Sequence, residues 1–205
     1  MRSNYRSIFV LGIFLLLIFS TTTFAIGNIY LDGMGALTKT TDARNQIGGG
    51  GALLYQVSND FNFFIKTVFN KRDVASETTS GEDYYKEYKY IMSLAGIEYL
   101  YNINKLPLFW KNSVGIGAGS VSIKEDFDSF SRKYRTDKDE TGLCVAAWTG
   151  LMYVFTQSIC GYIDVGIHKS FFADELKDDN IMGMQILVGV RITLWGVNKS
   201  IYNEY

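Results

Sequence analysis

Hydrophobic and polar residues alternate along most of the chain beyond residue 27. In the segment FNFFIKTVFN, residues 61–70, the odd positions hold mostly phenylalanine and isoleucine, whereas the even positions include asparagine and lysine. A repeat of two residues places one set of side chains on each face of a β-strand, while a helix would scatter the same residues around its circumference. The pattern therefore predicts β-structure.

Eight segments show this alternation. Short connections separate some of them, at 58–60, 102–107 and 156–158, and longer, charge-rich connections separate the others, at 39–46, 71–84, 122–141 and 172–180. The eight predicted strands cover roughly residues 28–38, 47–57, 61–70, 85–101, 109–121, 142–155, 158–171 and 181–195.

Strand length indicates where such a sheet would reside. Strands of soluble proteins are usually about 5 or 6 residues long, whereas a tilted strand needs about 9 to 11 residues to cross a bilayer. The predicted strands have the second length, and their connections are short at one end and long and polar at the other. We therefore predict an all-β fold, an eight-stranded antiparallel up-and-down transmembrane β-barrel, whose closure leaves no unpaired backbone edge in lipid.

Composition and the N-terminal pattern fit this prediction. The chain is 15% aromatic and has 20 glycines but a single proline, which is typical of sheet-rich proteins. At the start, Arg2 and Arg6 precede the apolar run 8–19 and a small residue, Ala25, which is the layout of a secretory signal peptide. We expect a signal peptide at 1–25, the barrel at 26–195 and a short C-terminal extension at 196–205.

Charge and cysteine usage narrow the possible functions. The formal net charge is −1 at pH 7, so nothing favours a nucleic-acid partner. If the chain turns near Gln157, Cys160 lies opposite Val154 and Cys144 lies opposite Ser170. The two sulfurs are then much too far apart for a disulfide, and we expect two free thiols.

The layout resembles the small eight-stranded outer-membrane barrels, the OmpA transmembrane domain and the OmpX-like group. The most specific element is the last segment, LVGVRITLW, in which Gly189 is followed by Ile192 and Leu194 at the third and fifth positions. This is similar to the C-terminal signal that such barrels present to the barrel-assembly machinery. The resemblance implies a monomer in the cell outer membrane, in contact with outer-membrane lipids.

Strand parity predicts which side chains point into the barrel. Eight strands enclose a space about wide enough for side chains alone, and Tyr30, Phe64, Trp148 and Tyr162 are expected to fill it opposite small residues. With the most apolar set of each strand facing lipid, the inward polar residues include Asp32, Lys66, Asp164, His168, Gln185 and Arg191.

Five charged residues are expected to form an ionic network at similar depth. Asp32, Lys66, Glu98, Asp164 and Arg191 all lie a few residues from the short-turn end of their segments. Because an unpaired charge in a closed interior would cost several kcal/mol, we expect Arg191 between Asp164 and Asp32, and Lys66 beside Glu98. Such a network would close the interior, although a narrow gated pore is the alternative.

Glu98 does not fit simple alternation. Its parity groups it with Tyr90, Met92 and Leu94, which we assign to the lipid face because they are apolar. A β-bulge at 95–96 would turn Glu98 inward, and we therefore expect one there.

The single histidine raises the possibility of catalysis. His168 and Ser170 form a His-x-Ser pair near the outer end of a predicted strand. The pair is similar to that of the lipid A 3-O-deacylase family, in which an acidic residue completes a triad. That resemblance implies a serine nucleophile activated by histidine, with Glu175, Asp178 or Asp179 as the acid.

Three observations favour a simple wall histidine instead. The serine is followed by Phe171 where that family has asparagine, and Met182 stands where the family has an acidic residue. Parity also directs His168 and Ser170 inward, away from an acyl chain arriving from the lipid. We therefore expect no catalytic residues.

Other motifs add no cofactor or metal. The acidic segment 173–180 lacks the ligand spacing of a calcium loop, and GGGG at 48–51 precedes neither a helix nor the Lys-Ser or Lys-Thr of a phosphate loop. We expect a structural or surface-interaction role through the loops at 71–84 and 122–141, which would bind an external ligand or a host surface. The alternatives are a small gated channel and, third, the lipid A acyl hydrolase.

Overall fold

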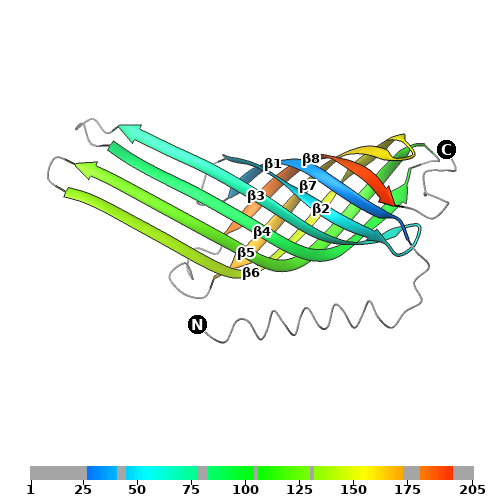
Figure 1. Ribbon diagram of the computed structural model, residues 1–205, viewed down its shortest axis with the longest axis horizontal. Helices are drawn as coiled ribbons and strands as arrows, with labels where there is room; N and C mark the ends of the chain where they lie inside the picture. The colour runs from blue at the N-terminus through cyan, green and yellow to red at the C-terminus, as the bar shows by residue number, and fades with distance from the viewer. Residues whose placement is uncertain are drawn as a thin grey trace.

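The fold is a closed, all-antiparallel barrel of eight strands (Figure 1). The computed structural model describes residues 27–40, 45–77, 83–103, 106–129, 132–172 and 181–195. The strands are β1 (Ile29–Thr40), β2 (Asn45–Gln56), β3 (Phe61–Glu77), β4 (Asp83–Asn102), β5 (Leu108–Ser129), β6 (Arg132–Thr156), β7 (Ile159–Phe171) and β8 (Met182–Trp195). Each strand pairs with its sequence neighbours and β8 pairs with β1, which confirms the predicted fold. Among the described residues, no helix is long and apolar enough to cross a membrane. The expected signal peptide and C-terminal extension lie outside the described residues.

Alternating residues face the lumen and the exterior in every strand of the barrel. In β1 the even positions from Tyr30 to Thr40 are buried, while Leu31 and Leu37 are exposed. The exterior is apolar, because the exposed set on the other strands includes Ile65, Val165 and Val188. An apolar outside around a polar inside is the arrangement that a membrane barrel requires.

The lumen is filled by large side chains that lie against glycines. Tyr162 pairs in register with Gly189, Trp148 with Gly166 and His168 with Gly183. A Cβ atom on Gly189 would come within 2.5 Å of the Tyr162 ring, and one on Gly166 within 2.3 Å of the Trp148 ring. The small residues therefore give these rings the space to cross a narrow interior. The expected inward positions of Tyr30, Phe64, Trp148 and Tyr162 are confirmed, since all four are buried.

The bulge expected at 95–96 is wrong. The ladders from β4 to β3 and to β5 continue without a shift, so Tyr90, Met92 and Leu94 face the lumen together with Glu98. The apolar residues point inward because β5 offers them space: Leu94 lies opposite Gly117 and Met92 opposite Gly119. The space available to these side chains, rather than their polarity, decides which face of β4 points into the lumen.

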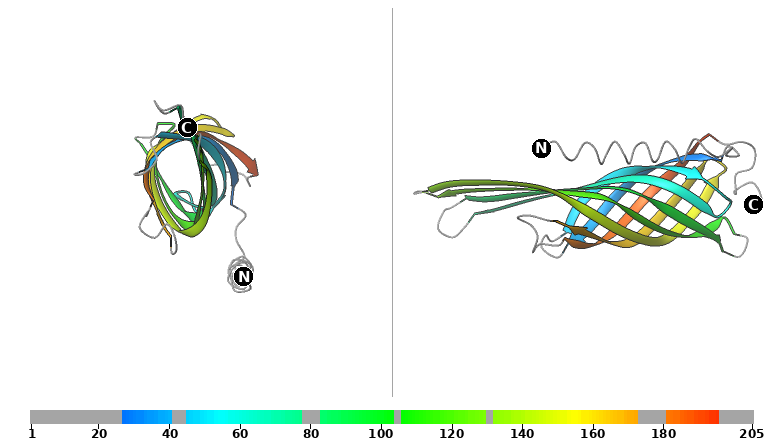
Figure 2. Two further views of the ribbon diagram at one scale, coloured as in Figure 1. Left: turned by 90° about the vertical axis from the view of Figure 1, so that its left-hand side faces the viewer. Right: turned by 90° about the horizontal axis from the view of Figure 1, so that it is seen from below.

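The regions 71–84 and 122–141 are largely strand, and their assignment as loops is wrong. β3, β4, β5 and β6 are 17, 20, 22 and 25 residues long, whereas the other four strands have 12 to 14 residues. Their outer parts form one four-stranded sheet that continues beyond the barrel along its long axis (Figures 1 and 2). We call this sheet the extension; it comprises residues 72–77, 83–88, 123–129 and 132–141.

Charged residues in the extension pair across its strands, which explains why a polar sequence forms strands here. Lys71 on β3, next to the extension, is 3.9 Å from Glu87 on β4 and 3.1 Å from Asp73 on its own strand. Lys86 on β4 contacts Glu125 on β5. Hydrogen bonding to the Lys89 ammonium holds the pKa of Glu87 below its usual value. Opposite charges on neighbouring strands each contribute a few tenths of a kcal/mol, to about 1 kcal/mol, to sheet stability.

The hairpin of β6 and β7 has the expected register. Cys144 lies opposite Ser170 and Cys160 opposite Val154, and both cysteines are free and buried. The prediction of two free thiols is confirmed.

The outward face of β7 gives a stability test of the barrel. Replacing Val165, at the middle of β7, by arginine should lower the free energy of unfolding in lipid by about 2–4 kcal/mol, because the charge would enter the hydrocarbon. Phe171→Arg, at the strand end, is the matched control and should cost only about 0–1 kcal/mol. Urea unfolding in liposomes measures both, and equal effects would contradict the assignment of this face to lipid.

Candidate functional site

Six charged side chains gather inside the short-turn half of the barrel. Each comes from a different strand and is at most 3% exposed. The cluster contains three acids and three bases, and we call it the lumen cluster: Asp32 (β1), Lys66 (β3), Glu98 (β4), Lys111 (β5), Asp164 (β7) and Arg191 (β8).

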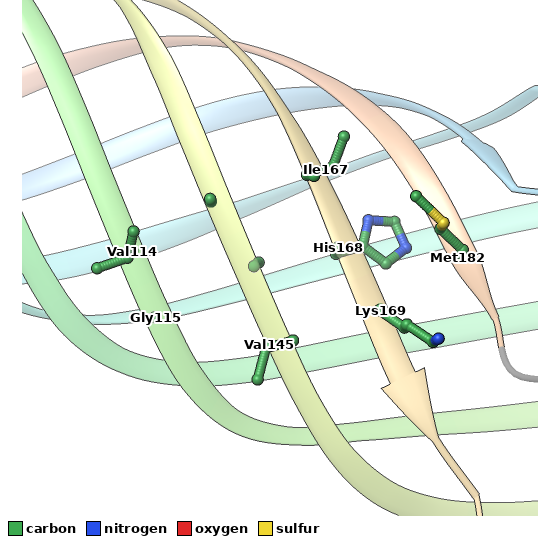
Figure 3. A pocket seen from close by; sticks show the side chains of 9 residues that line it. Val114, Gly115, Val145, Ile167, His168, Lys169 and Met182 are labelled. Carbon is green, nitrogen blue, oxygen red and sulfur yellow. The ribbon is translucent and has the colours of Figure 1, made fainter.

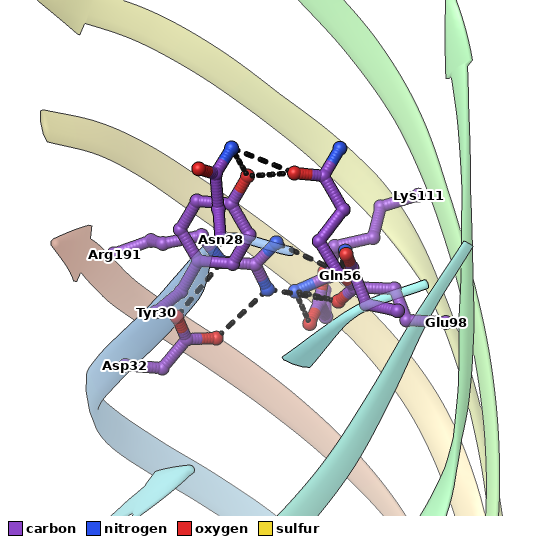
Figure 4. A network of polar contacts seen from close by, with 9 residues as sticks. Asn28, Tyr30, Asp32, Gln56, Glu98, Lys111 and Arg191 are labelled. Atoms are coloured by element: carbon purple, nitrogen blue, oxygen red, sulfur yellow. Dashed lines mark hydrogen bonds and ion pairs between the residues drawn. The ribbon is translucent and has the colours of Figure 1, made fainter. Parts of the chain in front are cut away.

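Arg191 is the centre of the lumen cluster. Its Nε and Nη2 donate to Asp32 at 2.8 and 3.0 Å, and its Nη1 and Nη2 donate to Glu98 at 2.7 and 2.9 Å (Figure 4). Asn62 also donates to Glu98 Oε1 at 2.9 Å. One guanidinium thus grips two carboxylates bidentately, which is the strongest ion-pair geometry available to arginine.

Lys111 connects Glu98, which Arg191 also binds, to Asp164. Its Nζ is 2.8 Å from Asp164 Oδ2 and 3.5 Å from Glu98 Oε2, and it lies 3.6 Å from the centre of the Tyr162 ring. Sequence reasoning missed this residue, although a signal was present. Lys111 has the same parity as Gly115, Gly117 and Gly119, which line the lumen on the same strand.

Lys66 binds aromatic rings instead of a carboxylate. Its Nζ lies 4.0 Å from the centre of the Trp148 ring and 5.1 Å from that of Phe64. No acid within the described chain reaches ion-pair distance of this ammonium. The expected pair of Lys66 with Glu98 is therefore wrong.

Two of the expected pairings fail because neighbouring strands are staggered. Arg191 lies opposite Asp32 on β1, and this pair forms, but on β7 it lies opposite Cys160, four residues from Asp164. Glu98 lies opposite Asn62, four residues from Lys66. Four residues along a strand are about 13 Å. The prediction that Arg191 pairs with Asp164 is wrong, because counting from the strand ends ignores this stagger.

Uncharged polar groups continue the network above and below the lumen cluster. Toward the long-strand end, Trp148 donates to Gln185, Gln185 to Thr38, and Thr38 to Asn70, at 2.8 to 3.1 Å. At the short-turn end, Asn28 and Tyr30 donate to Gln56 at 2.7 and 3.0 Å (Figure 4). The lumen therefore holds hydrogen-bonded polar groups on both sides of the lumen cluster.

His168 and Ser170 are not joined to each other. The Ser170 hydroxyl lies 2.6 Å from the hydroxyl of Tyr90, which is also 3.5 Å from Cys144 Sγ. The His168 ring stacks on Tyr90 with centres 5.3 Å apart, and neither of its nitrogens has a hydrogen-bond partner among the described residues. Glu175, Asp178 and Asp179 lie outside the described residues. This arrangement lacks the serine-to-histidine hydrogen bond that would activate a nucleophile.

A hollow of about 390 Å³ is lined by His168 and by mostly apolar neighbours (Figure 3). It is lined by residues of β5 to β8, among them Val114, Val145, Ile167 and Met182, with Lys169 also lining it. Ser170 is not among the lining residues. Ser170, which would be the nucleophile of a His-Ser pair, therefore does not face this hollow.

The two bases, Arg191 and Lys66, provide a test of the lumen cluster. Arg191→Met should lower the free energy of unfolding by about 3–5 kcal/mol, because it leaves the buried Asp32 and Glu98 without their main partner. Lys66→Met is the matched control. It should cost much less, because it removes a buried charge without stranding an acid. If urea unfolding shows the same loss of stability for Arg191→Met and Lys66→Met, the geometry of the cluster is contradicted.

Comparison with known proteins supports the fold. No family model matches the chain, and no curated protein sequence matches it. Among solved structures, Ail, the attachment invasion locus protein of Yersinia pestis, is 18% identical with a TM-score of 0.53, covering 82% of this chain and 97% of Ail. The structure of Ail in complex with the heparin analogue sucrose octasulfate is 19% identical with a TM-score of 0.51, and the match covers 82% of this chain and 97% of Ail. A major outer-membrane protein of Thermus thermophilus is 8% identical with a TM-score of 0.56, and the match covers 82% of this chain and 99% of that protein. The chain therefore has the fold of the small eight-stranded outer-membrane β-barrels.

Proposed function

We propose that the chain is a surface-exposed protein of the bacterial outer membrane that binds an external partner through the extension. The observation that carries the proposal is the continuation of four paired strands beyond the barrel. A paired sheet holds its side chains in fixed rows, as a binding surface requires, whereas flexible loops would first have to be ordered. The barrel then serves as its anchor.

The short turns support the orientation of the barrel, and the exposed aromatic residues mark the membrane interface at that end. Most of them lie near the short-turn end, including Tyr101, Trp110, Tyr153, Phe155 and Trp195. Aromatic residues gather at membrane interfaces, and short turns face the periplasm in bacterial barrels. This orientation directs the extension away from the cell. The apolar outer face of the barrel contacts outer-membrane lipids. The last strand, on which Ile192 and Leu194 are exposed, is the segment that the barrel-assembly machinery recognises.

Surface labelling tests this orientation. Thr136→Cys, in the extension, should react with a membrane-impermeant maleimide on intact cells. Ser158→Cys, in the short turn between β6 and β7, is the matched control and should react only after the outer membrane is permeabilised. Labelling in the opposite order would contradict the proposal.

The lumen cluster supports a closed barrel rather than a pore. Arg191, Glu98, Lys111 and Asp164 connect β8, β4, β5 and β7 across the interior, so ions would have to displace them to pass. The polar layers at several depths of the lumen are the observation that favours the alternative, a small gated channel. In planar bilayers we expect no steady conductance from the purified protein, and a long-lived open level would favour the channel instead.

The third function, a lipid A acyl hydrolase, has the least support. The Ser170 hydroxyl is bound to Tyr90, and the hollow beside His168 is not lined by the serine. We infer that the protein is not an enzyme and uses no cofactor or metal.

A further inference from the structure

One edge of the extension has a backbone that no described strand covers. β6 pairs with β7 only from Leu143 onward, whereas its pairing with β5 extends to Arg132. Residues 132–141 therefore form an edge strand on the side away from β5. An open strand edge is a template for another strand, and proteins use such edges to bind extended segments by β-sheet hydrogen bonds.

The sequence along this edge is complementary to itself. It reads RKYRTDKDET from residue 132 to residue 141, with basic residues gathered at its start and acidic residues at its end. If a second copy pairs antiparallel with Thr136 opposite Thr136, the register brings Arg132 beside Glu140, Lys133 beside Asp139 and Arg135 beside Asp137. Two-fold symmetry forms each of these pairs twice, and no like charges meet.

Neighbouring registers lose this match. A two-fold axis centred one residue later, at Asp137, places two aspartates opposite each other, and an axis at Arg135 places two arginines opposite each other. Directly opposite charges stabilise a β-ladder when they differ in sign and destabilise it when they agree. The charge pattern thus specifies a single register.

The key residues are accessible for such pairing. The side chains of Arg135 and Asp137 are 64% and 44% exposed. They lie 3.5 Å apart within one strand, and Arg135 is also 3.8 Å from the exposed Asp126 on β5. An exposed ion pair of this kind holds its partners weakly in water. Both residues can therefore exchange this contact for the corresponding residues of a second copy.

The direction of β6 determines how two molecules would meet. The extension continues the long axis of the barrel (Figure 2), so β6 runs roughly along that axis. Antiparallel pairing therefore places the two barrels at opposite ends of the joined strands, with their outer rims facing each other. Two barrels in one membrane have the same orientation and cannot pair in this way.

We propose that residues 132–141 of β6 bind the same segment of a second copy in a facing membrane, antiparallel about Thr136, and so join two cells. The proposal rests on the proposed function, because the extension must face outward. Each ladder is short, but many copies on two facing membranes act together, and this multiplies the strength of the contact. Each barrel remains a monomer within its own membrane.

Charge reversal tests the pairing with purified full-length protein in liposomes. Wild-type liposomes should cluster, and clustering should be lost in about 1 M salt, where the screening length falls to about 3 Å. Liposomes with Arg135→Asp alone should not cluster, because aspartates then meet at 135 and 137. Liposomes with Asp137→Arg alone should also fail, because arginines meet there. A mixture of the two variants should cluster again, since each then supplies the charge that the other lacks.

Cysteine cross-linking tests the register. Liposomes that carry Thr136→Cys should form a disulfide-linked dimer under mild oxidation, because the two residues lie directly opposite each other. When two separately prepared populations carry different tags, mixed-tag dimers should appear after they are combined. Thr141→Cys is the matched control: its two copies would lie about 33 Å apart and should not link.

The results separate this inference from the proposed function. Retained heat-modifiable gel mobility shows that each variant is folded. Folded variants that fail to cluster when mixed, wild-type liposomes that do not cluster, or equal cross-linking at 136 and 141 would each overturn the pairing. If maleimide nevertheless labels Thr136→Cys on intact cells, the outward-facing extension stands and only the self-pairing falls.

Discussion

The bidentate grip of Arg191 on Asp32 and Glu98 is the interaction around which the barrel is organised. Asp32 lies on β1 and Arg191 on β8, so one half of the grip spans the seam where the sheet closes. The other half crosses the lumen to β4. A charged group inside an apolar surrounding is costly unless its hydrogen bonds are satisfied, and here the three partners can satisfy one another only when the seam is closed. Closure and charge pairing therefore depend on each other.

The rest of the interior follows from the small cross-section of an eight-stranded barrel. Rings such as Tyr162 and Trp148 occupy the space above glycines of the neighbouring strands. This complementarity also allows Lys66 to remain buried, because its ammonium lies over the Trp148 ring. Polar side chains above and below the lumen cluster add further hydrogen bonds, such as Gln185 to Thr38 and Asn28 to Gln56. The lumen is thus packed as a core that mixes apolar and polar side chains.

Much of the barrel could be predicted from the sequence, because its chemistry repeats every two residues. The alternation gave the strand number, the topology and the inward positions of Asp32, Lys66, Asp164 and Arg191. It could not give the pairings, since these depend on the stagger between strands, which a pattern along a single strand does not contain. Simple parity was right to group Glu98 with Met92 and Leu94, and the whole group faces the lumen. The unneeded bulge came from assigning Met92 and Leu94 to the lipid face only because they are apolar. The extension was missed because its charges suggested solvated loops, whereas they pair between strands.

The unequal strand lengths also determine how the molecule bears a load. A force applied at the far end of the extension acts nearly along β3 to β6, parallel to the strands. The hydrogen bonds of the β5–β6 ladder, which runs from Leu108 to Ser129 on β5, are then loaded in shear and must yield together rather than one after another. A tether built from loops would stretch before it transmitted force to the barrel. This sheet passes tension directly into the part of the protein that the membrane holds.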